Sequence, residues 1–242
     1  MFVTGTDTGV GKTVLAATIC AVLAARGLRV AAFKPVVTGL DEAGEGAAGD
    51  PEARAPGGAQ PAAAWPPDHE LLAAAASAGQ APDEVAPLRF GPAVSPHHAA
   101  DLAGARIEPA ELVATARAAA ERADVLVCEG VGGLMVPLTP GYLVRDLAVD
   151  LGLPLAVAAR PGLGTINHSL LTVEAARAAG LDVRAVVLTP WPAEPSAMER
   201  SNRETVAALG AVAVEVLPAA TPDRLAEAGA ALPLDAWLDP RS

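Results

Sequence analysis

Residues 4–13 read TGTDTGVGKT, and this stretch decides the fold of the chain. A short apolar run, Phe2 to Thr4, precedes it, and a long alanine-rich apolar run follows Lys12. A Gly- and Thr-rich loop between a strand and a helix suits phosphate, because glycine lets backbone N–H groups point at an anion and the helix adds the positive end of its dipole. We therefore predict a strand, a phosphate-binding loop and a helix at the start of the chain.

The spacing of this loop differs from both common forms of the motif. The pattern G-x-x-x-x-G-K-[ST] requires glycine where this chain has Thr6, one residue after Gly5. A second form carries an extra lysine at the start of the loop, at the position of Asp7. The context is still typical of P-loop proteins, in which Lys12 would reach the β- and γ-phosphates and the Thr13 hydroxyl would bind Mg²⁺. The alternative is a Gly-rich turn with a chance GKT.

The composition of the chain argues against several classes of protein. Its 242 residues carry a formal net charge of −11 with only 17 Lys and Arg, and aromatic residues make up 3%, so a nucleic-acid partner is not expected. No uninterrupted apolar run reaches the length of a membrane span, so no membrane partner is expected either. The first strand begins at once, without a signal peptide before it, and we expect a cytoplasmic protein.

Cysteine and histidine residues give no sign of a disulfide or a transition-metal site. Cys20 and Cys128 fall in the interiors of a predicted helix and a predicted strand, which is typical of small core residues in a reducing compartment. His69, His97 and His98 lack companion ligands at metal-site spacing. We expect these histidines to be solvated or hydrogen-bonded.

Short apolar strands alternate with helical stretches along the rest of the chain. Strands are predicted at about 28–33, 124–128, 154–159, 183–188 and 212–216, and helices at about 108–122, 165–179 and 197–209. Residues 40–67, rich in Gly, Ala and Pro, predict a long flexible surface loop, after which Asp68 is a candidate N-cap. The alternation predicts one α/β domain over residues 1–242, P-loop NTPase-like, with a mainly parallel sheet and helices on both faces.

Ligands of such sheets bind outside the carboxyl ends of the strands, and three unusual segments fall there. Lys34 follows the second strand, where a solvated lysine is the alternative to a phosphate-binding one. Glu129 is predicted to end the strand at 124–128 and enter a Gly-rich turn, where Mg²⁺ is its natural partner and a surface turn acid is the alternative. The segment 160–164 (RPGLG) follows the next strand.

Five motifs in order carry a resemblance to a known family. They are TGTDTGVGKT (4–13), KPVVTG (34–39), SPH (95–97), EGVGGLMVPL (129–138) and GLGTINHSLLT (162–172). From residue 2 to about 210 the chain resembles dethiobiotin synthetase of biotin biosynthesis. The resemblance implies a homodimer that uses ATP and Mg²⁺ to close a ureido ring on 7,8-diaminononanoate with CO₂, through a carbamate and a carbamic-phosphoric anhydride.

The resemblance also implies the roles of individual residues. Lys12 and Lys34 are the catalytic residues, with Lys34 on the carbamate and the γ-phosphate. Mg²⁺ is bound by Thr13, Asp68 and Glu129, with Glu70 as the alternative to Asp68. The residues implied to bind the nucleotide and its metal are Thr8, Gly9, Val10, Gly11, Lys12, Thr13, Val14, Asp68, Glu129, Gly130, Val131, Gly132, Thr189, Pro190, Leu217, Pro218 and Ala219.

The substrate residues implied by the resemblance are Thr38, Gly164, Thr165, Ile166 and Asn167. The last four open a helix whose N-terminus would bind the carboxylate of the substrate across the dimer interface, since an uncompensated helix start suits an anion. An ordinary capped Gly turn is the alternative. Residues 134–136 (LMV) would contact the aliphatic chain or the partner helix, or simply pack in the core.

One segment departs from the pattern of the family. Many members carry an Asn-Asp or similar pair after the strand at 183–188, where it recognises adenine, whereas this chain reads Thr189-Pro190-Trp191-Pro192. Proline has no amide N–H, and the segment holds no side-chain amide. The sequence therefore leaves base selectivity open, and nucleotides besides ATP are candidates.

Two other classes share parts of the pattern. A ParA/MinD-like ATPase switch would have the same fold, but Asp7 in place of the extra loop lysine and the acidic net charge count against it. A cobyrinate-type amidoligase would also activate a carboxylate by phosphorylation. It would need ammonia or a glutaminase domain, and 242 residues leave no room for the latter.

Overall fold

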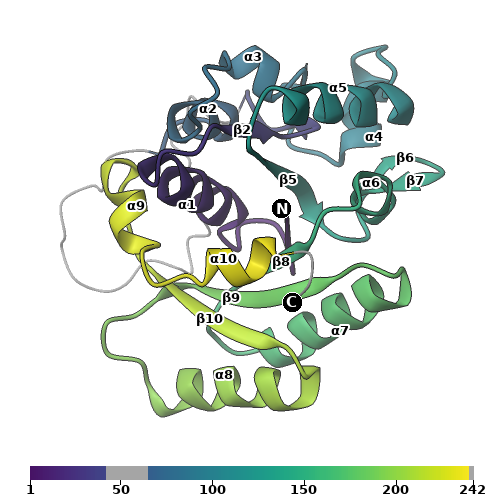
Figure 1. Ribbon diagram of the computed structural model, residues 1–242. Helices are drawn as coiled ribbons and strands as arrows, with labels where there is room; N and C mark the ends of the chain where they lie inside the picture. The colour runs from purple at the N-terminus through teal and green to yellow at the C-terminus, as the bar shows by residue number, and fades with distance from the viewer. Residues whose placement is uncertain (42–64, 240–242) are drawn as a thin grey trace.

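The computed structural model describes residues 1–41 and 65–239, whose central element is a sheet of six parallel strands (Figure 1). The strand order is β10-β9-β8-β1-β5-β2. The strands are β1 (Phe2–Gly5), β2 (Val30–Phe33), β5 (Val125–Gly133), β8 (Leu155–Ala159), β9 (Val183–Trp191) and β10 (Ala213–Pro218). The predicted parallel α/β sheet is confirmed, and the phosphate loop after β1 leaves from its middle.

Helices cover both faces of this sheet, as predicted. One face carries α1, which packs on β1, β2, β5 and β8 and is flanked by α2 and α9, whereas α5, α7 and α8 pack on the opposite face (Figure 1). The helices are α1 (Lys12–Ala25), α2 (Asp68–Ala75), α3 (Pro82–Val85), α4 (Pro96–Leu102), α5 (Pro109–Glu121), α6 (Val144–Leu151), α7 (Thr165–Ala178), α8 (Ala197–Gly210), α9 (Leu225–Ala228) and α10 (Leu234–Leu238). Among them, no helix is both long enough and apolar enough to cross a membrane.

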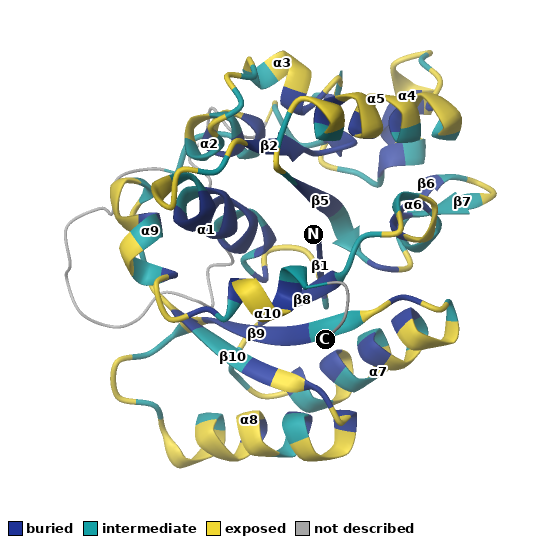
Figure 2. Ribbon diagram, viewed as in Figure 1, coloured by how far each residue is buried: buried dark blue, intermediate teal, exposed yellow. Residues whose placement is uncertain are grey.

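Side chains of the central strands alternate between two cores, one on each face of the sheet. Much of this sheet is coloured as buried in Figure 2. In β1, Phe2 packs in the core under α5 and α7, whereas Val3 packs in the core under α1. Cys128 and Cys20 lie in these same two cores, both buried and free, which confirms them as core residues. Burial raises the pKa of Cys20 to about 12 and that of Cys128 above its ordinary range, so neither thiol is poised to react.

The edge strand β2 is closed by side chains instead of a further strand. Ser77 Oγ accepts the N–H of Val30 at 2.9 Å and donates to the carbonyl of Leu28 at 2.7 Å. Gln80 pairs with both backbone groups of Ala32, at 2.8 and 3.0 Å. Since an unpaired edge invites pairing with another chain, these bonds protect β2 and fix its position.

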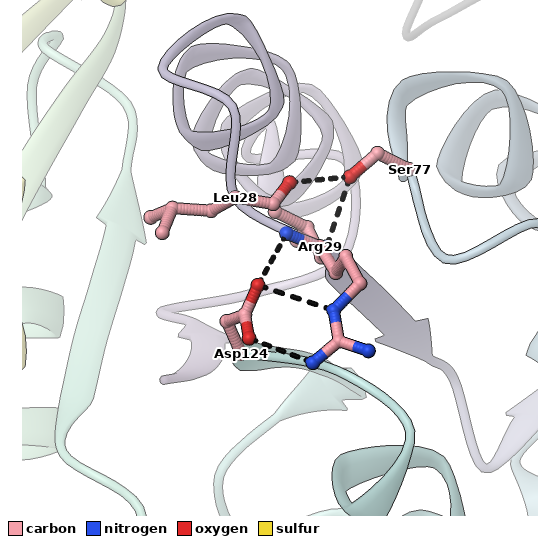
Figure 3. A network of polar contacts seen from close by, with 5 residues as sticks. Leu28, Arg29, Ser77 and Asp124 are labelled. Carbon is pink, nitrogen blue, oxygen red and sulfur yellow. Dashed lines mark hydrogen bonds and ion pairs between the residues drawn. The ribbon is translucent and has the colours of Figure 1, made fainter.

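The start of β2 is also tied to the start of β5. Asp124 accepts the backbone N–H of Arg29 at 2.8 Å and its guanidinium at 2.9 Å (Figure 3). The two strands then run side by side in register toward their carboxyl ends, where Phe33 lies across from Cys128. Lys34 and Glu129 follow directly, so the register of this pair brings a lysine and a glutamate together.

Several predicted boundaries differ from the structure. β2 begins at Val30, two residues late, and β9 continues past residue 188 to Trp191. The prediction that Asp68 is an N-cap is wrong: it is the first residue of α2, Pro67 occupies the cap position, and the Asp68 carboxylate binds Lys34 instead of a backbone N–H. Of the predicted 40–67 loop, residues 42–64 lie outside the described residues.

Short elements escaped prediction altogether. Besides α3, α4, α6, α9 and α10, they include two small sheets. In one, β3 (Val36–Val37) pairs in parallel with β4 (Leu88–Arg89), and in the other β6 (Pro137–Thr139) pairs in antiparallel fashion with β7 (Tyr142–Leu143). Elements of two to eight residues have too few positions to display a period, so the pattern of apolar residues could not reveal them.

Candidate active site

The phosphate loop connects β1 to α1 and folds back over the end of β1. A Cβ on Gly5 would lie 2.9 Å from Lys12 Cδ, so the Lys12 side chain crosses this glycine closely. Lys12 Nζ then donates to the carbonyl of Asp7 at 2.7 Å. Gly11, with φ at 91°, precedes α1, whose N-terminus has neither a side-chain cap nor an acidic residue in its first turn. An uncapped helix start and a lysine therefore face the same loop, which suits an anion.

A cluster of charged side chains lies beside this loop, contributed by three elements. Lys34, directly after β2, places its Nζ 2.5 Å from Glu129 Oε1 in β5 and 2.6 Å from Asp68 Oδ2 at the start of α2. The Thr13 hydroxyl of α1 donates to the same Glu129 oxygen at 2.9 Å. Glu129 is 0% exposed and Lys34 is 4% exposed. Predicted residues that are far apart in the chain thus meet at one edge of the sheet.

Glu129 lies inside a strand, not at its end, which corrects the prediction of a strand ending at 129 and a Gly-rich turn. It lies opposite Val3 in the pairing of β1 with β5, and β5 continues until Gly133 pairs with Gly5. Glycine is needed in this run for two reasons: a Cβ on Gly130 would lie 2.8 Å from a Val144 methyl group, and Gly132 has φ at 61°. The alternative of a surface turn acid is therefore wrong.

The two lysines of the site differ in their electrostatic surroundings. Burial opposes the charge of Lys34, but Glu129 and Asp68 together outweigh burial and raise the pKa of Lys34 above its ordinary value. Burial lowers the pKa of Lys12 to about 8. Burial raises the pKa of Glu129, although the charge of Lys34 opposes this shift. Burial would also raise the pKa of Asp68, but Lys34 and the Thr13 hydroxyl outweigh it and lower that pKa. Two carboxylates thus accompany two lysines before any anionic ligand binds.

One atom of the cluster fits a metal ion. Glu129 Oε2 is buried and has no hydrogen-bond partner in the described part of the chain, which is costly for a carboxylate oxygen. With the Thr13 hydroxyl and the Asp68 carboxylate it forms a set of hard oxygen donors, the kind that Mg²⁺ prefers. Residues 1–41 and 65–239 hold no group of three or more His, Cys, Asp or Glu side chains suited to a metal. Mg²⁺ commonly completes its coordination with water and phosphate oxygens, so a small protein donor set is compatible with it.

The alternative ligand and the histidines are also placed. Glu70 is exposed, whereas Asp68 is the acid that contacts Lys34. His69 is only 6% exposed, and neither its Nδ1 nor that of His97 has a hydrogen-bond partner among the described residues. The prediction of solvated or hydrogen-bonded histidines holds for His98, which is exposed, whereas the Nδ1 atoms of His69 and His97 have no such contact among the described residues. His69, on α2, is buried, and His97, on α4, is half-buried.

The remaining loop and strand residues predicted for the nucleotide fall near one another. Thr8 and Gly9 are exposed at the entrance of the phosphate loop, whereas the Val10 side chain is buried beneath it. A Cβ on Gly132 would lie 3.6 Å from Thr8 Oγ1, so the end of β5 runs beside this entrance. Val131 is half-buried on the same stretch.

The residues predicted for the substrate lie on two segments. Thr38 is half-buried and follows the short strand β3 after Lys34. The N-terminus of α7 has Gly164 at its cap position with φ at 92°, no side-chain cap and no acid in its first turn. This excludes the predicted alternative of a side-chain-capped turn. Of its neighbours, Thr165 is buried, Ile166 is half-buried and Asn167 is exposed.

The apolar side chains of residues 134–136 and of Leu163 divide between the core and the surface. Leu134 is 3% exposed and packs in the core, and Val136 packs against the same core. Met135 is 53% exposed, and Leu163, just before α7, is 93% exposed. Core packing therefore holds for Leu134 and Val136, and a contact of Met135 with the aliphatic chain or the partner helix stays a prediction.

The segments predicted for the base lie at the ends of β9 and β10. Thr189 is 2% exposed, and its Cγ2 would lie 2.7 Å from a Cβ on Gly11, so β9 ends against the phosphate loop. Pro190 follows through a cis peptide bond. The Leu217 side chain is buried in the core, so it does not line the pocket of about 420 Å³ beside it. That pocket is lined by Pro218, Ala219, Ala220, Thr221, Arg224, Glu227 and Ala228.

The sequence placed the segment 160–164 at a strand end but gave Arg160 no role at the loop. Arg160, the residue after β8, donates from Nη2 to the carbonyl of Thr8 at 3.2 Å. β8 pairs with β1, with Ala158 opposite Gly5, so Arg160 emerges next to the phosphate loop. Its position just after a parallel strand was the available signal, because strand ends are where such sheets bind ligands.

Known proteins resemble this chain over most of its length. A family model described as an AAA domain matches residues 1–222. The ATP-dependent dethiobiotin synthetase of Anaeromyxobacter dehalogenans (strain 2CP-1) is 41% identical over 188 residues, which cover 78% of this chain and 75% of that protein. The protein of the same name from Bacillus velezensis is 31% identical over 208 residues, covering 86% and 81%.

One solved structure also aligns with most of the chain, at low similarity. The cell division ATPase MinD of Pyrococcus furiosus aligns with a TM-score of 0.49 and 16% identity, covering 90% of this chain and 82% of that chain. The sequence relatives are far more similar and span most of both partners. The chain belongs to the ATP-dependent dethiobiotin synthetase family.

Proposed function

We propose that this chain catalyses ATP-dependent dethiobiotin synthesis in biotin biosynthesis, as a cytoplasmic cyclo-ligase that joins 7,8-diaminononanoate and CO₂. The relatives that bear the name dethiobiotin synthetase support the reaction class. The observation that carries the proposal is the meeting of Lys12, Lys34, Thr13, Glu129 and Asp68 beside one phosphate loop. Phosphoryl transfer needs cations placed in advance around a group that gathers negative charge, and this cluster provides them.

The proposed reaction has three steps. One amine of the substrate attacks CO₂ and loses a proton, which leaves a carbamate. A carbamate oxygen then attacks the γ-phosphorus of ATP, ADP departs, and a carbamic-phosphoric anhydride forms. The second amine attacks the carbonyl carbon of this anhydride, phosphate departs with the former carbamate oxygen, and the nitrogen loses its proton as the ureido ring closes.

The two lysines have different parts in this sequence. Lys12 crosses the phosphate loop, and a phosphate in place of the Asp7 carbonyl would bind its ammonium. Lys34 stays charged because Glu129 and Asp68 raise its pKa, so it can stabilise the carbamate and the transferring phosphoryl group. In the described state Lys34 binds both carboxylates, which holds it at the edge of the loop.

Mg²⁺ fits the oxygen donors of this cluster. Thr13, Glu129 and Asp68 would hold it, with the unpartnered Glu129 Oε2 as the main argument. When bound, Mg²⁺ would neutralise charge on the phosphate oxygens during transfer. It would also offset the two carboxylates, leaving Lys34 available to the reacting groups.

A homodimer would complete the substrate site. The carboxylate of the substrate lies several methylenes from its two amines, and the uncapped N-terminus of α7 is an anion site on a different strand end from Lys34. Leu163, directly before α7, and Met135, after β5, both expose apolar side chains, as interface residues would in an isolated chain. We propose that the 162–168 segment of one subunit binds the tail of the substrate held at Lys34 of the other.

Base selectivity is proposed to be relaxed. Pro190 offers no N–H, and the pocket beyond β10 is lined by small apolar residues together with Thr221, Arg224 and Glu227. Arg224 and Glu227 pair with each other at 2.6 Å. No amide side chain lines this pocket to read the edge of adenine, so other nucleoside triphosphates should support turnover.

Phosphate release tests the proposed function. Purified protein is mixed with diaminononanoate, bicarbonate, Mg²⁺ and ATP, and each component is omitted in turn. Dethiobiotin and phosphate should appear in equal amounts, and every omission should abolish both. Phosphate release that is indifferent to diaminononanoate, or stimulated by DNA or lipid vesicles, would favour an ATPase switch instead.

A further inference from the structure

We infer that Arg160 binds the terminal phosphoryl group of the nucleotide, and thereby supplies from β8 the second loop cation that the loop itself lacks. The inference rests on the proposed function, since it concerns the same phosphate loop. It adds a residue that the motifs of the loop do not contain. Its support is a position, a contact and a balance of charges.

The position of Arg160 follows from the sheet. β8 lies next to β1, and the Thr6 N–H donates to the carbonyl of Ala158 at 3.0 Å. The residues that follow Ala158 therefore lie beside the start of the phosphate loop. Arg160 is exposed there, as are Asp7, Thr8 and Gly9, which form the entrance of the loop. A ligand entering the loop would pass this guanidinium.

The contact places the guanidinium over the loop entrance. Arg160 Nη2 donates to the carbonyl of Thr8, and it would lie 3.7 Å from a Cβ on Gly9. Gly9 has φ at 70°, a conformation that glycine adopts without strain, and the missing side chain leaves the surface beneath the guanidinium open. A guanidinium presents its N–H donors in a planar fork whose geometry matches the oxygens of a phosphate.

The charges of the site leave a need for a further cation at the loop entrance, where Arg160 lies. Lys12 and Lys34 are accompanied by Glu129 and Asp68, so these four side chains sum to no net charge. At the loop entrance, where a second lysine occurs in a related form of the motif, this chain has Asp7, whose carboxylate accepts the Thr8 N–H at 2.7 Å. A transferring phosphoryl group gathers negative charge and needs a cation at that end of the loop. Arg160 is the arginine that the described residues place there.

Nucleotide binding without turnover provides the test. Affinities for ADP and for a non-hydrolysable ATP analogue, adenosine β,γ-imidotriphosphate, are measured with Mg²⁺ for the wild type, Arg160→Gln and Arg160→Lys. The Gln variant should bind the triphosphate analogue at least about tenfold more weakly and ADP within about twofold, because only the analogue carries the terminal phosphoryl group. The Lys variant keeps the charge without the fork and should fall between.

The control is Arg117→Gln on α5, which removes the same charge from another exposed arginine that donates to a carbonyl, that of Asp150. It should leave both affinities unchanged. An equal loss of ADP and analogue in Arg160→Gln would mean that the arginine only shapes the loop, and unchanged affinities would mean that it has no part in binding; either result overturns the inference. The readout needs no diaminononanoate, so a failure of dethiobiotin formation is recognised separately.

Discussion

Lys34 Nζ lies 2.5 Å from Glu129 Oε1, and the two residues are 4% and 0% exposed. A charge pair so deeply buried has little free energy to gain from its attraction, because removing both ions from water costs several kcal/mol each. Its value lies in function: it keeps a charged lysine and a carboxylate with an unpartnered oxygen side by side at the phosphate loop.

Breaking this pair should destabilise the fold more than removing it. Lys34→Met leaves Glu129 buried without its cation and should lower the free energy of unfolding by about 3–5 kcal/mol. The double variant Lys34→Met/Glu129→Gln removes both charges and should recover a large part of that loss. Urea unfolding of the two single variants and the double variant measures the coupling. Additive losses would mean that the two side chains do not interact as described.

Metal dependence should follow Glu129. Glu129→Gln keeps the shape of the side chain but replaces a charged oxygen donor, so the Mg²⁺ concentration for half-maximal turnover should rise at least about tenfold. Glu70→Gln is the matched control, since Glu70 is exposed and lies in the first turn of α2, as Asp68 does. If the Glu70 variant, and not the Glu129 variant, needed more Mg²⁺, the alternative ligand Glu70 would be the residue that binds the metal.

Lys12 should make stability depend on pH in a specific window. Its folded pKa of about 8 is below the ordinary value of 10.5, so between these values the unfolded chain binds more protons and stability rises with pH. The cost of burying the charge, about 3 kcal/mol at most for this shift, is fully present below pH 8 and is lost as the pH approaches 10.5.

The Lys12→Met variant isolates this effect. Relative to the wild type, the variant should gain most stability below about pH 8, and this gain should be lost progressively between about pH 8 and 10.5. Other titrating groups cancel in the comparison, as does the pH-independent loss of the bond to Asp7. Parallel curves of unfolding free energy against pH would mean that Lys12 keeps an ordinary pKa.

Mixed dimers test whether the substrate site crosses the interface. Lys34→Leu and Gly164→Trp should each be inactive, and a dimer containing one chain of each should recover activity at the one site that carries neither lesion. Gly164→Ala is the control for backbone strain, because it has the same φ of 92° without the bulk, and nothing lies within 4 Å of its Cβ. Subunit exchange must be demonstrated first. Exchanged dimers that remain inactive would place the tail site within one chain.

Much of this site could be predicted from sequence because parallel strands deliver their next residues to one edge. Lys34 follows an apolar strand and the phosphate loop follows another, so their meeting required only the α/β pattern. The depth of Glu129 could not be predicted, because the glycines after it are typical of a turn as well as of a strand pressed against its neighbours. The position of Arg160 at a strand end could be predicted as well, but its contact with the loop could not, because a single arginine has no motif that assigns it to Thr8.

Oxygen transfer tests the account most directly. If a carbamate oxygen attacks ATP and later leaves with phosphate, then CO₂ labelled with ¹⁸O should give released phosphate containing one labelled oxygen, and the ureido carbonyl of dethiobiotin should keep the other. The reaction is run in unlabelled water and stopped before CO₂ exchanges its oxygen with water. The ¹⁸O content of both products is then measured by mass spectrometry. One labelled oxygen in phosphate for each dethiobiotin formed is the predicted result. Phosphate that takes its new oxygen from water would contradict the account, because ATP would then be hydrolysed instead of activating a carbamate.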